Sequence, residues 1–113
     1  ILLVPNIETG NALVKMMVYF MGACAAGVVE AVLKTLGSFL VVELMRQGAT
    51  PQEACEEAIA RIVKNQNYKD MQIGYLAINK KGDHGAYAVH PWFNYALHQG
   101  GENRMIDSLS YLK

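Results

Sequence analysis

Apolar positions follow a helical period through the first part of the chain and cluster in short runs after residue 71. The continuous apolar run from Ile1 to Val4 predicts a buried strand that ends at Pro5. Apolar residues three or four apart then predict helices over about residues 9–22, 28–47 and 51–66. The start of the third helix is marked most clearly. Thr50 can cap it, a proline follows, and Glu53 can reach back to the cap amide.

The last third of the chain has the pattern of strands. Apolar and aromatic runs at 71–79, 84–90 and 93–98 are separated by turns rich in glycine and proline, which is typical of antiparallel hairpins. Residues 100–103 form another loop, and 105–112 a short terminal strand or irregular tail. The predicted order is β-α-α-α-β-β-β. We therefore expect one α+β domain over residues 1–113, two-layered, with helices on one face of a mostly antiparallel sheet.

Charge and composition argue against several classes of partner. Ten basic residues balance ten acidic ones without a basic stripe, so no nucleic acid is expected. The longest uncharged run, residues 16–29, is shorter than the ~20 residues that a membrane helix needs, so no membrane is expected. Cys24 and Cys55 lie in apolar helical stretches, and we expect buried, reduced thiols rather than a disulfide. Reduced cysteines are typical of cytoplasmic proteins, so we expect a cytoplasmic chain.

Three stretches in the second half carry a resemblance to a known enzyme family. They are VVELMRQGATPQEAC at 41–55, KDMQIG at 69–74 and NKKGDHGAY at 79–87. Residues from about 25 to 113 thereby resemble the C-terminal part of the β-subunit of the glycosylasparaginases, which are N-terminal-nucleophile amidohydrolases. The resemblance implies a self-cleaving enzyme. In such an enzyme the newly exposed threonine attacks the substrate amide, and its own α-amino group serves as base.

Much of that family's site has no counterpart here. Ile1 stands first and offers no nucleophile, and the family's substrate-clamping arginine and aspartate loop is missing. We expect the three threonines to serve a helix start, a helix body and a cap: Thr9, Thr35 and Thr50. The family's oxyanion loop, similar to ATGHGE, corresponds to 25–30, where Gly27 matches but Ala26 and Val29 replace the threonine and second glycine. Losing one oxyanion donor typically lowers the rate about 10²–10³-fold. Gly27 is thus expected as a substrate-binding remnant, with no catalytic residue.

The opening residues resemble a second family. The run LLVPNIETGN at 2–11 and the later AGVV are similar to the phosphate acetyl/butyryltransferases, which makes 1–29 an acyltransferase-like segment and 30–113 a glycosylasparaginase-like one. The phosphate-binding loop that the resemblance implies after AGVV is replaced by EAVL, so no arginine clamps a phosphate. A weak anion or coenzyme A site at a helix N-terminus remains a candidate, with turn formation and capping as the alternative. Its residues are Asn6, Thr9, Gly10 and Asn11.

The remaining candidates are a metal site formed by the histidines and an interface formed by the sheet. His84 and His90 lie on one predicted strand at even spacing and should share a face, and His98 closes the next strand. No short ligand motif joins them to other donors, so no metal and no cofactor are expected. The hydrolases resembled here are four-layer αββα sandwiches, and this chain lacks most of the second sheet. An uncovered apolar sheet face would favour a homo-oligomer.

Three functional hypotheses follow. The leading one is an engineered or recombined domain, built from two enzyme fragments joined at about residues 25–29, without native catalytic activity. The second is a truncated glycosylasparaginase-like amidohydrolase subunit that needs a partner chain to supply the missing residues. The third is a weak anion or coenzyme A binder at residues 6–11.

Overall fold

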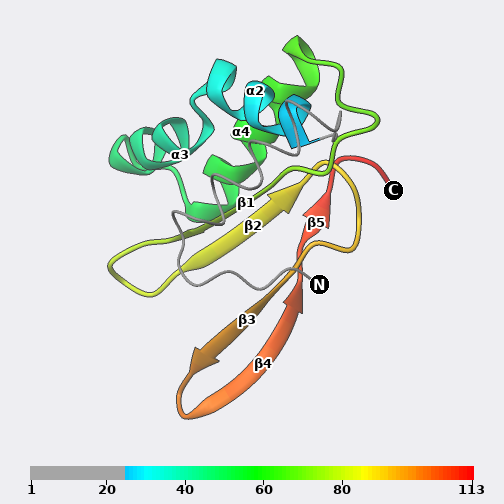
Figure 1. Cartoon of the computed structure of the whole chain (residues 1–113). Helices are drawn as coiled ribbons and strands as arrows, with labels where there is room; N and C mark the ends of the chain where they lie inside the picture. The colour runs from blue at the N-terminus through cyan, green and yellow to red at the C-terminus, as the bar shows by residue number, and fades with distance from the viewer. Residues whose placement is uncertain (1–24) are drawn as a thin grey trace, which may run out of the picture.

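The computed structural model describes residues 25–113 (Figure 1). Within them, helices α2 (Ala25–Thr35), α3 (Gly37–Arg46) and α4 (Pro51–Asn65) come first. Strands β1 (Gly74–Ile78), β2 (His84–Ala88), β3 (Asn94–Gln99), β4 (Glu102–Asp107) and β5 (Leu109–Ser110) follow. The helices lie on one side of β1 and β2 (Figure 1), which confirms the predicted α+β architecture. The strand predicted at 1–4 and the helix predicted at 9–22 fall outside the described residues.

Helix α4 begins as its sequence predicts. The Thr50 hydroxyl accepts a hydrogen bond from the Glu53 amide at 3.2 Å, and the Glu53 carboxylate accepts one from the Thr50 amide at 2.9 Å. These two bonds form a capping box, with Pro51 in the first turn. The inward face of the helix is fully buried at Ala54, Cys55, Ala58, Ile59 and Ile62. This buried face packs against β1 and β2.

The prediction of a single helix over 28–47 is wrong, because two helices, α2 and α3, occupy this stretch. The helix is interrupted at Leu36, whose backbone takes a left-handed conformation with φ 48° and ψ 43°. Gly37 follows, and a methyl group at this position would overlap the Tyr75 side chain. Close packing against β1 thus accounts for the glycine and for a change of helix direction here. Four large apolar residues of this stretch are exposed: Leu33, Leu36, Phe39 and Val42.

The strands form two sheets. In the first, with the order β1-β2-β5, β1 pairs antiparallel with β2 from Gly74↔Ala88 to Ile78↔His84, and β5 pairs parallel with β2. In the second, β3 and β4 pair antiparallel. This hairpin extends away from the helices (Figure 1). The segment 105–112, predicted as a short terminal strand or irregular tail, is divided between β4 and β5. The last strand returns to the first sheet.

The core lies between the helices and the helix-facing side of β1 and β2. Ile59 and Ile62 from α4 pack there with Tyr75 and Ala77 from β1, and Val89 follows β2. Burying an aliphatic side chain of this size contributes about 1.5–3 kcal/mol. The start of α4 lies so close to β2 that a methyl group on Gly85 would overlap its backbone. In the part of the chain that the structure describes, no helix is long and apolar enough to cross a membrane.

Candidate functional site

A groove of about 720 Å³ lies between α3 and β1. Its walls come from two elements that are far apart in sequence, and they are mostly apolar. The lining residues are Ser38, Val41, Val42, Met45 and Arg46 from α3, with 75–80 from β1 and the following turn. Such a surface can bind by apolar burial and by backbone hydrogen bonds rather than by acid–base chemistry.

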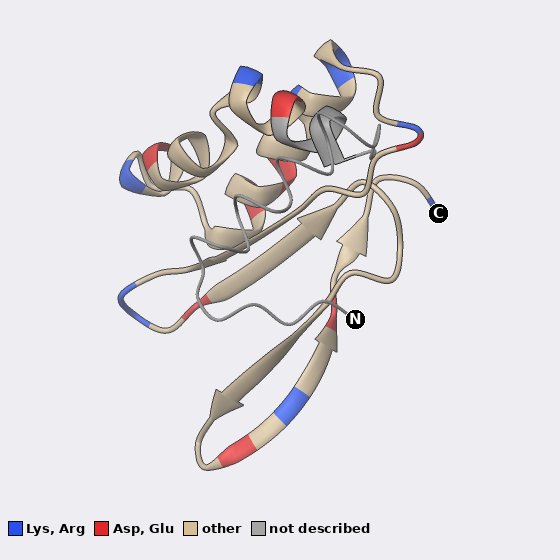
Figure 2. Ribbon diagram, in the orientation of Figure 1, with Lys and Arg blue, Asp and Glu red and all other residues tan. Residues whose placement is uncertain are grey.

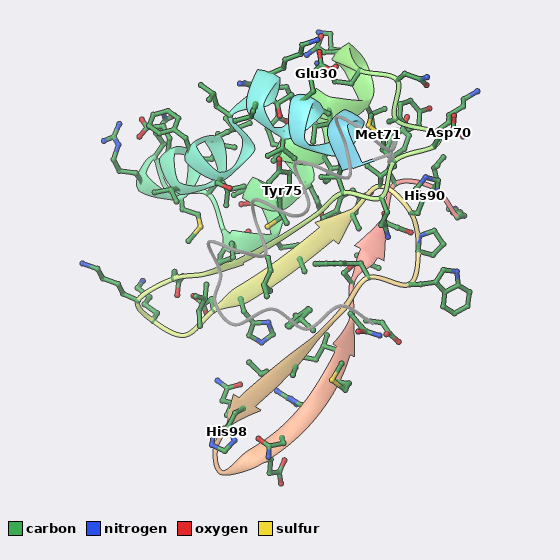
Figure 3. The ribbon with its side chains drawn as sticks, in the orientation of Figure 1. Glu30, Asp70, Met71, Tyr75, His90 and His98 are labelled. Carbon is green, nitrogen blue, oxygen red and sulfur yellow. The ribbon has the colours of Figure 1, made fainter. Side chains whose placement is uncertain are left out.

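Tyr75 forms the inner wall of this groove. Figure 3 shows its side chain on the helix side of β1, and its closest approach to α3 is at Gly37. The hydroxyl oxygen is buried and has no hydrogen-bond partner among residues 25–113. Burial raises the pKa of Tyr75 above its ordinary value of 10.0. The hydroxyl is therefore neutral at physiological pH and acts in packing, not as a base.

Two basic residues line the groove. Arg46 ends α3, and Lys80 lies in the turn after β1. Figure 2 shows basic residues in blue at the end of α3 and in the β1–β2 turn. The Arg46 guanidinium donates to both oxygens of the Glu43 carboxylate, at 2.7 and 2.6 Å. This pairing lowers the pKa of Glu43 and raises that of Arg46. Lys80 makes no ion pair with the described residues, so it is the cation available to a bound carboxylate.

The described threonines make hydrogen bonds within their helices, and the described cysteine is buried. The Thr35 hydroxyl, at the end of α2, bonds to the Ala31 carbonyl oxygen at 2.9 Å, and Thr50 caps α4. The predicted role of Thr50 as a cap is confirmed, whereas Thr35, predicted within a helix body, is the last residue of α2. Cys55 is fully buried, as predicted, and burial together with nearby Glu56 raises the pKa of its thiol to about 11. A thiol in this state is protonated at neutral pH and is a poor nucleophile.

The other predicted site residues are not brought together. Gly27 lies within α2. Asn6, Thr9, Gly10 and Asn11 lie outside the described residues, so the anion site remains a prediction.

The histidines are also dispersed. β2 ends at Ala88, so the prediction that His84 and His90 share a strand is wrong. The His84 ring bonds to the Tyr95 hydroxyl at 2.9 Å, while His98 bonds to Asn103 at the far end of the β3–β4 hairpin (Figure 3). Among residues 25–113, no group of three or more His, Cys, Asp or Glu side chains is placed to hold a metal ion.

The groove itself was not predicted. Nothing in the order of residues places β1 beside α3. The available signal was Gly37, whose missing side chain allows a neighbouring element to approach closely.

Comparison with known proteins identifies hydrolase relatives, although no family model matches the chain. The chain is 51% identical over 88 residues to an N(4)-(beta-N-acetylglucosaminyl)-L-asparaginase of Elizabethkingia miricola, which covers 74% of this chain and 26% of that protein. It is 40% identical over 77 residues to a putative protein of the same name from Drosophila grimshawi, covering 66% of this chain and 19% of that protein. A probable isoaspartyl peptidase/L-asparaginase 3 of Arabidopsis thaliana is 37% identical over 78 residues, covering 67% and 21%.

The chain is thus homologous to glycosylasparaginases and isoaspartyl peptidases over most of its length, and it spans about a quarter or less of these relatives. The hypothesis of an engineered or recombined domain is wrong. One hydrolase relative accounts for 74% of the chain, and none of the eight significant matches has the name of an acyltransferase. The acyltransferase-like assignment of residues 1–29 is therefore unsupported.

Proposed function

We propose that this chain is part of the catalytic subunit of an amidohydrolase of the glycosylasparaginase type, and that it works together with the remaining polypeptide. The observation that carries the proposal is the 51% identity to the Elizabethkingia enzyme. That enzyme's name specifies an asparagine whose side-chain N4 carries N-acetylglucosamine. In the proposed reaction water cleaves the side-chain amide. Its oxygen goes to the carbonyl carbon to give aspartate, and the nitrogen leaves with the sugar.

The contribution of the described residues is structural in this proposal. Thr35 and Thr50 are engaged in helix bonds, and the Cys55 thiol is held protonated. The proposal therefore places the nucleophile outside the described residues. The three helices and the β1-β2-β5 sheet supply a packed support for it. The exposed apolar residues of α3 and β1 are consistent with a chain that packs against further protein.

The test is reconstitution. The chain is combined with the Elizabethkingia enzyme from which the matching 88-residue segment has been deleted. Release of N-acetylglucosaminylamine from N4-(β-N-acetylglucosaminyl)-L-asparagine is then followed, with each polypeptide alone as control. Activity in the mixture only is the expected result. An assembled mixture that hydrolyses neither this substrate nor a β-aspartyl dipeptide would overturn the proposal.

The β-aspartyl dipeptide separates the two kinds of relative. Identity is higher to the glycosylasparaginase of Elizabethkingia than to the isoaspartyl peptidase of Arabidopsis, 51% against 37%. We therefore expect the glycosylated asparagine to be the better substrate. Faster cleavage of the dipeptide would assign the chain to the second kind of hydrolase.

A further inference from the structure

Trp92 combines two features that are each unfavourable on their own. Its backbone takes φ 75°, in the left-handed region that bulky side chains rarely adopt. Its side chain is 92% exposed, so the indole ring makes little contact with the rest of the described chain. Backbone strain of this kind persists only where the surrounding structure imposes it, and it is common at ligand-binding sites.

The residues just before Trp92 are held by one side chain. The Gln72 side-chain nitrogen donates to the carbonyl oxygens of His90 and Pro91, at 3.0 and 3.3 Å. The Gln72 side-chain oxygen accepts a hydrogen bond from the His90 amide at 2.9 Å. These three bonds fix the chain as it enters the left-handed turn at Trp92.

The residue just after Trp92 is anchored as well. The Phe93 carbonyl oxygen accepts a hydrogen bond from the Ser108 amide at 2.9 Å. The Phe93 ring lies over Gly74 of β1, where a methyl group would overlap it. Of two consecutive aromatic residues, one therefore packs on the sheet and the other is presented to solvent by the loop between β2 and β3, which curves out to one side of the sheet (Figure 1). A ligand of the indole ring would not have to order this loop on binding.

The surroundings of the ring are polar but carry little charge. The stretch from 84 to 101 contains no Lys, Arg, Asp or Glu. His90 is partly exposed and Asn94 is exposed, so a neutral hydrogen-bonding side chain stands two residues to either side of Trp92. Figure 3 shows His90 at the edge of the fold, where the chain leaves β2. One carboxylate is close by register, because Asp107 pairs with Asn94 across the β3–β4 hairpin.

This combination fits a neutral saccharide better than an anion or a membrane. A pyranose has an apolar face of C–H groups that an indole can cover, and a rim of hydroxyls that donate and accept hydrogen bonds. A phosphate would need a cation, and the stretch from 84 to 101 offers no Lys or Arg. Binding to anionic lipids likewise depends on Lys or Arg near the inserted aromatic ring.

We propose that Trp92 is a stacking platform for a neutral saccharide, with the polar groups of His90 and Asn94 available to its hydroxyls. The inference rests on the proposed function for the kind of sugar, because the proposed substrate carries N-acetylglucosamine. The C–H face of the sugar lies on the indole ring, which the loop already holds in its exposed position. The strain at residue 92 is thereby explained as the cost of presenting the ring.

The first test uses the fluorescence of the unaltered chain. Trp92 is the single tryptophan of the sequence, so the emission reports on this position alone. The chain is titrated with N,N′-diacetylchitobiose, which contains two N-acetylglucosamine units. The emission maximum should shift to shorter wavelength as the ring leaves water, and the shift should saturate with a dissociation constant of about 1 mM or below. No saturable shift up to about 20 mM would overturn the inference.

The same signal distinguishes other occupants of the ring. Tetramethylammonium chloride tests for an organic cation, which would also stack on an indole face. Vesicles of phosphatidylcholine and phosphatidylserine test for a membrane surface. A saturable shift with either probe and none with the disaccharide would overturn the inference. A shift that grows with the concentration of the chain alone would also overturn it, since a second copy would then cover the ring.

The second test changes the ring itself. Saturation transfer from the chain to the disaccharide is measured by NMR, which needs no tryptophan. Trp92→Tyr keeps an aromatic ring and should retain the transfer, whereas Trp92→Gly should lower it at least about tenfold. Met105→Ala is the matched control, because it removes another exposed apolar side chain and should leave the transfer unchanged. Equal transfer to Trp92→Gly and to the unaltered chain would refute the platform.

The melting temperature shows whether Trp92→Gly folds normally. Glycine adopts φ 75° without strain, so this variant should melt no lower than the unaltered chain. A loss of sugar binding then reports on the ring and not on unfolding. A clearly lower melting temperature would contradict the exposed position of the ring and overturn the inference.

Hydrolysis separates the two proposals, because sugar binding is measured on the chain alone. Saturable binding without hydrolysis of either substrate in the reconstituted mixture would keep the platform and remove the proposed function. Hydrolysis without saturable binding would keep the proposed function and remove the platform.

Discussion

The contact between Gly85 and the start of α4 makes Gly85→Ala the most informative substitution in the core. The new methyl group would overlap the backbone nitrogen and α-carbon of Gln52, which cannot rotate away as a side-chain tip would. Helix α4 must therefore move off β2. Overpacking of this kind costs about 1–3 kcal/mol, and we take the upper end because backbone is displaced.

Two further effects nearly cancel. Moving α4 also breaks the hydrogen bond from the Ala86 amide to the Gln52 side-chain oxygen, now 3.1 Å long, at a cost of about 1 kcal/mol. Replacing glycine by alanine in a strand returns about 0.5–1 kcal/mol. The free energy of unfolding should fall by about 3 kcal/mol, and the melting temperature by about 12–24 °C for a domain of this size.

Urea unfolding followed by circular dichroism measures this change. Gln52→Ala is the matched control, because it removes this hydrogen bond and the bond from the Gln52 side-chain nitrogen to the Glu56 carboxylate, but leaves the backbone contact in place. It should lower the free energy of unfolding by about 1 kcal/mol only. A Gly85→Ala chain within about 0.5 kcal/mol of the unaltered chain would refute the close packing of α4 on β2.

Four other predictions concern the helix cap, the buried hydroxyl and the buried thiol. Thr50→Ala should lower the free energy of unfolding by about 1 kcal/mol in the same urea assay. The hydrogen bond from the Thr50 amide holds the pKa of Glu53 below 4.5. The ionised Glu53 carboxylate therefore stabilises the fold at neutral pH, and this stabilisation is lost as the pH falls through the pKa of the folded state. A Glu53→Gln chain should accordingly lose less stability than the unaltered chain between about pH 5 and about pH 3. Tyr75→Phe removes a buried hydroxyl without a partner among the described residues, and should raise the melting temperature, with about 1 kcal/mol of added stability. In a Cys24→Ser chain, the Cys55 thiol should react with a thiol reagent at least about a hundredfold faster in urea than when folded, and equal rates would contradict its burial.

Short-range signals located most of the described elements. The Thr50, Pro51 and Glu53 pattern marks where α4 begins because capping depends on residues within one turn. The glycine-containing turn at 80–83 predicts the β1–β2 hairpin for the same reason. The family resemblance of residues 41–55 and 79–87 is also carried by the sequence, and the homology to glycosylasparaginases agrees with it. The acyltransferase-like assignment rested on the short run LLVPNIETGN, which was too little to define an origin.

The sequence by itself determined the helix cap, the hairpin turn and the α+β class, because each depends on neighbouring residues or on their period. Only the tertiary structure decided where the helix from 28 to 47 breaks, since Gly37 is required by Tyr75, which lies far along the chain. It also decided that β5 pairs with β2, and that a mostly apolar groove lies between α3 and β1. These features arise from contacts between distant segments, and periodicity within one segment carries no information about which segment will lie against it.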